Sequence, residues 1–89
     1  MEITIEWTEE DVDHIRKHNV EPNEVESIFG FKYYHRKRGN FIDVIGRTSG
    51  SRILFVVLEW RGQEYRVAFA RDADVSEKNL YKRKAKGRV

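Results

Sequence analysis

The chain has 89 residues, a net charge of +2 and no cysteine. A length of 89 residues predicts one domain, residues 1–89, with a single modest core, and the lack of cysteine excludes disulfides and thiolate metal sites. The longest apolar run, Ile53–Leu58, is far too short to cross a bilayer, and the acidic N-terminal residues are unlike a secretory signal. We therefore expect a cytoplasmic domain with little room for an enclosed active site.

Charge is distributed unevenly along the chain. Residues 1–30 contain nine acidic and two basic side chains, a balance of −7, whereas residues 31–89 contain six acidic and fifteen basic ones, a balance of +9. A basic half attracts polyanions even when the whole molecule is close to neutral. Nucleic acid is therefore the first partner that the sequence predicts.

The N-terminal third predicts a short strand followed by two helices. Apolar and polar residues alternate over Ile3–Trp7, as in a half-buried strand. Thr8 is then suited to cap a helix over Glu9–His18. The acidic side chains in the first turn of this helix interact favourably with the positive end of the helix dipole. Pro22 opens a second helix, because proline at the first helical position loses no needed donor, and Gly30 ends it.

From residue 31 the hydrophobic period changes to that of strands. We predict four strands, Lys32–Arg36, Phe41–Arg47, Arg52–Trp60 and Gln63–Ala70. Because short turns separate them, they form an antiparallel meander. The run Ile53–Leu58 is apolar on both faces, so the third of these strands should be central and covered by the helical pair.

A last helix follows the strands. Asp74 and Glu77 have the spacing of a capping box, and Leu80 and Tyr81 are expected to point inward. The basic tail, residues 82–89, has no apolar stripe and is expected to fray. The predicted fold class is α+β, in the order β-α-α-β-β-β-β-α, with a helical pair on one face of an antiparallel sheet and a C-terminal helix.

Three stretches of the sequence resemble the BrnT family of toxins from type II toxin-antitoxin systems. They read RKHNVEPNEVESIF, IGRTSGSRILFVVLEWRGQEYRVAFAR and SEKNLYKRK, and with Trp7 before them they extend over nearly the whole chain. The matching positions are Trp7, Lys17, His18, Phe29, Ile45, Gly46, Arg47, Arg66, Ala70, Arg71, Glu77 and Tyr81.

The resemblance implies a fold similar to RelE and a set of functional properties. It implies a metal-independent endoribonuclease that inhibits growth by cleaving RNA, needs no cofactor, and is neutralised by a co-encoded, BrnA-like antitoxin. Such a toxin is expected in the cytoplasm as a toxin-antitoxin hetero-oligomer or as a homodimer.

Arginines are the candidates for binding the reacting phosphate. Cleavage of RNA creates a dianionic phosphorane, and a guanidinium binds phosphate oxygens through two N–H groups while staying charged. Arg47, Arg66 and Arg71 lie in or at the ends of predicted strands, and we expect them to converge on one phosphate. Arg66 and Arg71 have opposite parity, so either a bulge or the strand end near Ala70 re-aims Arg71, or the two do not share a site. For each arginine a solvated surface charge remains the alternative.

Three residues are candidates for proton transfer, each with a structural alternative. His18 and Lys17 end the first helix, where cations are favoured by the dipole whatever their role. Tyr81 is suited to supply a phenol near the phosphate, and equally to pack the last helix on the sheet. Lys17 and three further cations are candidates for contacts with backbone phosphates: Lys78, Lys82 and Arg83.

Two other readings of the sequence stay open. Asp72 and Asp74 lie beside the predicted phosphate site, and two acids there favour a module of the same fold that binds RNA or protein without cleaving. Trp60 and its aromatic neighbours suit either base stacking, cross-strand packing or a dimer surface. No metal-binding or phosphate-loop spacing occurs in the sequence, so we predict neither a metal nor a cofactor.

Overall fold

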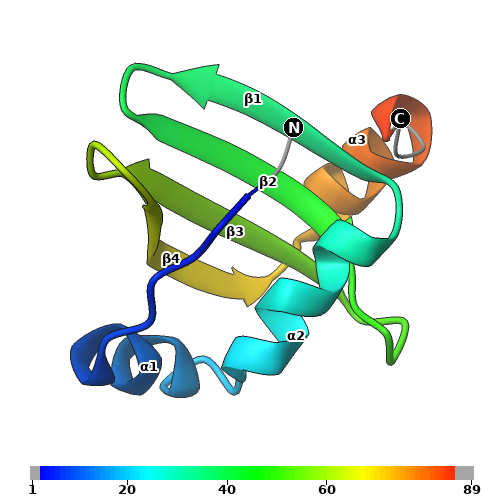
Figure 1. Ribbon diagram of the computed structural model, residues 1–89. Coiled ribbons are helices and arrows are strands. Elements are labelled where there is room, and N and C mark those ends of the chain that lie inside the picture. The colour runs from blue at the N-terminus through cyan, green and yellow to red at the C-terminus, as the bar shows by residue number, and fades with distance from the viewer. Residues whose placement is uncertain (1–2, 86–89) are drawn as a thin grey trace.

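Residues 3–85, the part of the chain that the computed structural model describes, contain one four-stranded sheet and three α-helices (Figure 1). The elements are α1 (Glu9–Arg16), α2 (Pro22–Ser27), the short 3-10 helix η1 (Ile28–Gly30), β1 (Tyr33–Arg38), β2 (Phe41–Arg47), β3 (Ile53–Trp60), β4 (Tyr65–Asp72) and α3 (Val75–Lys84). The strands are antiparallel in the order β1-β2-β3-β4. The predicted α+β class and the meander are confirmed, and β3 is an inner strand as expected.

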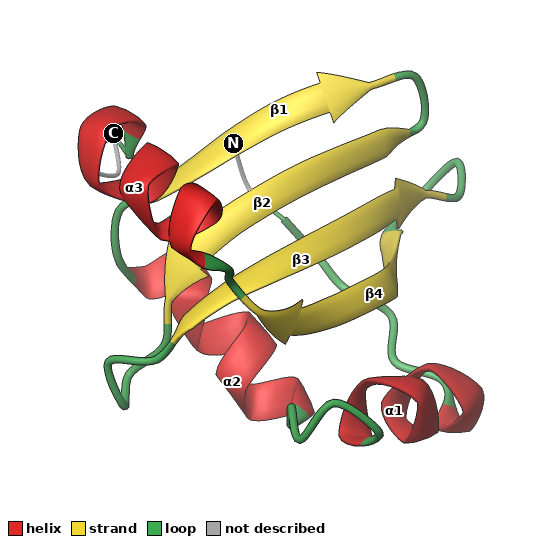
Figure 2. Ribbon diagram, turned by 180° about the vertical axis from the view of Figure 1, so that it is seen from behind, coloured by secondary structure: helices red, strands yellow, loops and turns green. Residues whose placement is uncertain are grey.

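The helices lie on both sides of the sheet. Figure 1 shows α2 in front of it with α1 beyond the β4 edge, and Figure 2 shows α3 against the opposite face. The larger core fills the α1 and α2 side, where the fully buried residues include Ile15, Val25, Leu54 and Val56. A smaller cluster around Tyr81 fills the space under α3. No helix in the described range is long and apolar enough to cross a membrane.

Local capping signals in the sequence locate the helix starts correctly. The Thr8 hydroxyl accepts a hydrogen bond from the backbone N–H of Asp11. Asp74 and Glu77 form the predicted capping box, in which each side chain accepts from the other residue's backbone N–H. These bonds satisfy donors that the first helical turn leaves without partners.

Several predicted boundaries are wrong. Strands β1 and β4 begin and end one or two residues later than predicted. The N-terminal strand is reduced to one parallel bridge between Ile5 and Tyr65, because the segment crosses the sheet face and meets only the edge strand β4. Helix α1 ends at Arg16, not at His18, since Asn19 adopts the left-handed conformation at φ 61°. Helix α3 continues through residues 82–84, which were expected to fray, whereas residues 86–89 lie outside the described range.

A β-bulge alters the edge strand β4. The pairing of β3 with β4 shifts between Val57 and Leu58, so that Val57 pairs with Phe69 while Leu58 pairs with Val67. The extra residue, Ala68, reverses the alternation of side chains beyond it. Arg66 and Arg71 therefore occupy register positions on the same face of the sheet, which is one of the two solutions that their opposite parity requires.

Candidate functional site

Arg66 is held by an acidic residue of α1. Its Nε and Nη2 donate to the two carboxylate oxygens of Asp11 at 2.9 and 3.1 Å. The Asp11 side chain is only 13% exposed, and the hydrogen bond from Arg66 lowers the pKa of this carboxyl below its ordinary value. This pair links residues far apart in sequence and fastens α1 to the edge strand.

Arg71 is oriented from two directions. Its Nη1 and Nη2 donate to the carboxylate of Glu77 at 2.8 and 2.9 Å, and Nη1 also donates to the carbonyl of Asp72. The guanidinium stacks over the ring of Phe55 at 4.6 Å from its centroid, and the Phe69 ring lies 5.8 Å away. A guanidinium has five N–H groups, so these bonds leave Nε–H and one Nη2–H, adjacent on one edge, for another acceptor.

Arg47 has no carboxylate partner within residues 3–85. Its Nη1 donates to the Ser51 hydroxyl at 3.1 Å, and its guanidinium lies over the ring of Phe31 at 4.2 Å. Both contacts hold it at the end of β2, next to the turn that leads to β3. It remains a cation available to an anionic ligand at that end of the sheet.

The three arginines do not converge on one phosphate, contrary to the expectation. Arg66 is opposite Glu59 and Arg71 is opposite Phe55, four residues apart on β3, which corresponds to about 13 Å along the strand. Their guanidinium groups also turn away from each other, toward α1 and α3 respectively. The bulge brings them to one face, but their ion pairs keep them apart.

A different set of side chains gathers at the junction of α1 and β4. His14 and His18 are separated by one helical turn, and their ring centroids lie 6.3 and 5.2 Å from that of Phe69. The two imidazole rings are 6.4 Å apart. Since Arg71 lies on the same phenyl ring, two imidazoles and a guanidinium surround Phe69. We call His14, His18, Phe69 and Arg71 the histidine cluster.

An open hollow of about 380 Å³ borders this cluster along α1 and is lined by Glu10, Asp13, His14, Lys17 and His18. The structure thus brings together three predicted site residues, Lys17, His18 and Arg71. His14 and Phe69 are not among the predicted site residues. The spacing of four residues between the two histidines, which puts both on one helix face, was the signal that could have identified His14.

Tyr81 is 6% exposed and belongs to the small core under α3. Its hydroxyl donates to the carbonyl of Lys32 at 3.4 Å. This environment matches the packing alternative, and Tyr81 does not reach the histidine cluster through any described contact. The three predicted phosphate contacts of the last helix are all exposed: Lys78, Lys82 and Arg83.

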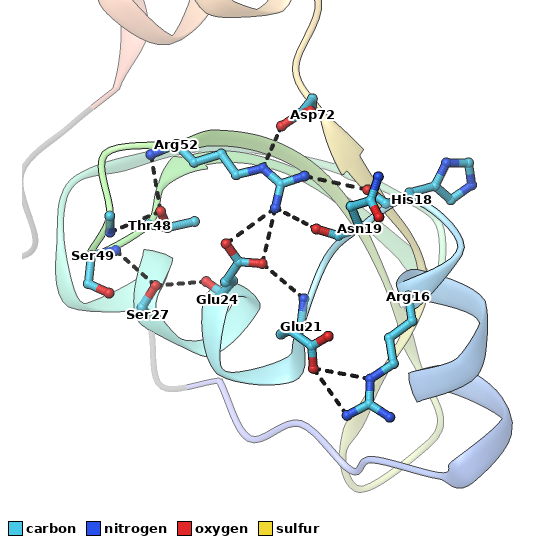
Figure 3. A network of polar contacts seen from close by, with 11 residues as sticks. Arg16, His18, Asn19, Glu21, Glu24, Ser27, Thr48, Ser49, Arg52 and Asp72 are labelled. Carbon is cyan, nitrogen blue, oxygen red and sulfur yellow. Dashed lines mark hydrogen bonds and ion pairs between the residues drawn. The ribbon is translucent and has the colours of Figure 1, made fainter.

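Arg52, which the sequence analysis missed, is the centre of the polar network in Figure 3. Its guanidinium donates to the backbone carbonyls of His18 and Asn19, where α1 has ended, at 3.4 and 2.6 Å. It also bonds both carboxylate oxygens of Glu24 in α2, at 3.1 and 3.2 Å, and one oxygen of Asp72 in β4, at 2.6 Å. One side chain therefore joins the ends of α1, α2, β3 and β4.

The network gives Asp72 and Asp74 structural roles. The bond from Arg52 lowers the pKa of Asp72 below its ordinary value, and Asp74 caps α3 through the backbone N–H of Glu77. Both acids have partners of their own within the fold. Their presence beside Arg71 therefore has a structural explanation within the fold.

No protein-family model matches the sequence, and no curated protein matches it. Histidine, aspartate and glutamate side chains in residues 3–85 do not gather into a group that could hold a metal ion. The histidine cluster and the resemblance to the BrnT family are therefore the observations that bear on function.

Proposed function

We propose that the chain is a toxin-type, metal-independent endoribonuclease whose scissile phosphate binds at the histidine cluster. The observation that carries the proposal is the arrangement of His14, His18 and Arg71 around the ring of Phe69. These are the side-chain types that phosphodiester cleavage requires, within one patch of an exposed surface.

The reaction needs two proton transfers and one anionic centre. The 2′-oxygen of the substrate attacks the adjacent phosphorus, the bond from phosphorus to the 5′-oxygen breaks, and a 2′,3′-cyclic phosphate forms. One imidazole accepts the proton of the 2′-hydroxyl, and the other, in its protonated form, gives a proton to the leaving 5′-oxygen. Two histidines in complementary protonation states therefore complete the cycle without a further group.

Arg71 is suited to stabilise the phosphorane. Its unused Nε–H and Nη2–H lie on one edge of the guanidinium, the geometry that binds two oxygens of one phosphate. Glu77 and Phe55 fix its orientation in advance, so little ordering is required when RNA binds. Lys17 in the adjoining hollow adds positive charge, and Phe69 offers a ring on which a base can stack.

An antitoxin would neutralise such an enzyme by covering the cluster. The chemistry of the site calls for a partner that presents carboxylates to Arg71 and Lys17 in place of phosphates. A BrnA-like, co-encoded protein of the cytoplasm is the partner that we propose. A gene for a small DNA-binding protein beside this one would support the assignment.

Cleavage of RNA in the presence of a chelator tests the proposal. We expect fragments with 2′,3′-cyclic phosphate ends, and losses of at least about 100-fold in rate for His14→Ala and for His18→Ala. Both histidines are exposed, so neither substitution should affect folding. The matched control is His35→Ala, an exposed histidine of β1. Full activity in both α1 variants, prepared alongside the control, contradicts the assignment.

A non-catalytic RNA-binding module is the second candidate. It is favoured by the carboxylate partners of Arg66 and Arg71, which occupy both guanidinium groups in part. For this candidate the same incubation leaves RNA intact but retards it in a gel, with a shift that weakens as salt rises. Growth arrest on expression that Arg71→Ala relieves would favour the enzyme instead.

A further inference from the structure

A small pocket opens at the far end of the sheet from α3, where the helices no longer cover it. It has a volume of about 130 Å³ and is lined by Lys37, Gly39, Asn40, Ile42, Trp60 and Tyr65. We call it the hairpin pocket, because the β1–β2 turn forms one wall. We infer that the hairpin pocket binds a single pyrimidine base of the RNA strand, an inference that rests on RNA being the ligand of the proposed function.

The aromatic wall of the pocket is suited to stacking. Trp60 is 39% exposed although it ends an inner strand. Its ring packs against that of Tyr65, with 4.9 Å between the ring centroids and an angle of 57° between the ring planes. The backbone N–H of Trp60 donates to the carbonyl of Asn40 at 2.7 Å, which fixes the residue beside the turn. A rigid, exposed indole is the platform on which single-stranded bases stack.

The size of the pocket selects one ring. An engineered cavity of about 150 Å³ takes up benzene, so a hollow of about 130 Å³ matches the six-membered ring of a pyrimidine and not the two fused rings of a purine. The Asn40 amide both donates and accepts, as the edge of a pyrimidine requires. Lys37 lacks a carboxylate partner within residues 3–85 and can meet a base carbonyl or a phosphate.

Strand β4 connects the hairpin pocket with the histidine cluster. Tyr65 lines the pocket and Phe69 belongs to the cluster, but the bulge at Ala68 puts them on opposite faces of the sheet. Their partners on β3, Trp60 and Val57, are three residues apart, or about 10 Å along the strand. Stacked nucleotides advance by about 3.4 Å each, so an RNA strand that occupies both sites passes around the β4 edge and contains at least about three nucleotides between them. The pocket would therefore determine which base is held a few nucleotides from the cleaved bond.

Fluorescence of Trp60 reports binding directly. The chain has two tryptophans, so Trp7→Phe leaves Trp60 as the single reporter. The probe is a 2′-O-methyl oligouridine hexamer, which cannot be cleaved because its 2′-hydroxyls are blocked. We expect saturable quenching by this hexamer, weaker binding of the corresponding oligoadenosine, and no quenching by an abasic hexamer.

Substitutions then test the pocket in the protein with both tryptophans. Trp60→Ala is expected to weaken binding of the hexamer by roughly 5- to 150-fold, the contribution of one stacked base, and Trp60→Phe to retain most of the affinity. Lys37→Ala should also weaken binding and serves as a second variant that leaves the core untouched. Unchanged affinity in Trp60→Ala and Lys37→Ala, or equal affinity for the abasic hexamer, overturns the inference.

The outcomes separate this inference from the proposed cleavage. His18→Ala should leave quenching of Trp60 intact, because His18 is not part of the hairpin pocket. If the unaltered protein shows quenching but does not cleave RNA, the nuclease is contradicted and the pocket is supported. Cleavage that Trp60→Ala leaves unchanged, with no quenching, would contradict the pocket alone. A mass that depends on protein concentration and falls to the monomer in Trp60→Ala, with no effect of the hexamer, would identify a dimer surface and overturn the inference.

Discussion

Arg66 and Asp11 form a bidentate ion pair between β4 and α1, with Nε–Oδ2 and Nη2–Oδ1 distances of 2.9 and 3.1 Å. The two residues are 55 positions apart in the sequence. The hydrogen bond from Arg66 depresses the pKa of Asp11 in the folded chain. A carboxyl whose pKa is lower folded than unfolded stabilises the fold above the unfolded value, about 3.9, and loses that contribution as the pH falls through the folded value.

We therefore expect the midpoint of urea unfolding to fall as the pH is lowered below about 4. Asp11→Asn should lower this midpoint at pH 7 and flatten its dependence on pH, because the neutral amide gives no charged pair to lose. Asp13→Asn removes the same charge from an exposed position of α1 and should change neither the midpoint nor the slope appreciably. Parallel pH profiles for Asp11→Asn and the unaltered protein would contradict the assignment.

Under the proposed function, the Glu77 carboxylate offsets part of the positive charge that Arg71 presents to RNA. Glu77→Gln keeps an oxygen that can accept from the Asp74 backbone N–H, so α3 remains capped, but it removes the charge that pairs with Arg71. We expect tighter RNA binding and a slope of log affinity against log salt steeper by about 0.7, the value for one more phosphate contact on a single strand. The measurement is a titration of uncleavable RNA at several salt concentrations.

The control for Glu77→Gln is Glu9→Gln, which changes the net charge equally at an exposed position in the first turn of α1. A general electrostatic effect would alter both variants alike. Only the loss of a carboxylate that offsets the charge of Arg71 at the phosphate site predicts a steeper slope in Glu77→Gln alone.

Arg52 contributes more to stability than an ordinary surface arginine. Arg52→Ala leaves the carbonyls of His18 and Asn19 without a donor and leaves the partly buried carboxylate of Glu24 with only the backbone N–H of Glu21. Losing charged hydrogen bonds of this kind should lower the free energy of unfolding by about 2–3 kcal/mol. Urea unfolding followed by circular dichroism measures the change.

Arg16→Ala is the matched control for Arg52→Ala. Its partner is Glu21, and both side chains of that pair are about half exposed, at 53% and 51%. Exposed pairs contribute little because water and salt screen them, so the loss should stay below about 0.5 kcal/mol. Equal losses in the two variants would show that the network around Arg52 stabilises the fold no more than an exposed ion pair does.

The sequence predicts the structural features that depend on residues close together along the chain. The capping box of Asp74 and Glu77 and the strand Phe41–Arg47 are observed with the predicted residues, because each is set by local spacing and alternation. Contacts across the fold are different. The partners of Arg52 lie in α2, in β4 and in the loop after α1, and no periodicity in the sequence relates them.

In the candidate site, too, local features follow from the sequence whereas contacts between distant residues do not. The order of Arg66 and Arg71 raises the need for a bulge, but its position at Val57 and Leu58 depends on the packing of β4 against α1 and the core. The pairing of each arginine with a carboxylate, which separates them, joins elements that meet only in the folded chain. Composition predicts a basic surface, whereas the arrangement of its charges requires the fold.

Gly46 is required by the contact between η1 and β2. A Cβ added at Gly46 would lie 2.9 Å from the Cβ of Ile28 and 3.3 Å from the Cβ of Tyr33. Side chains so close cannot move aside without shifting their own backbone, since Ile28 is fully buried. Gly46→Ala should therefore destabilise the protein by about 1–3 kcal/mol.

The matched control is Gly30→Ala. At Gly30, the end of η1, an added Cβ meets nothing within 4 Å, so this substitution should change stability by less than about 0.5 kcal/mol. Thermal unfolding of the two variants compares them directly, and a melting temperature for Gly46→Ala at or above that of Gly30→Ala would disprove the close approach of η1 to the sheet.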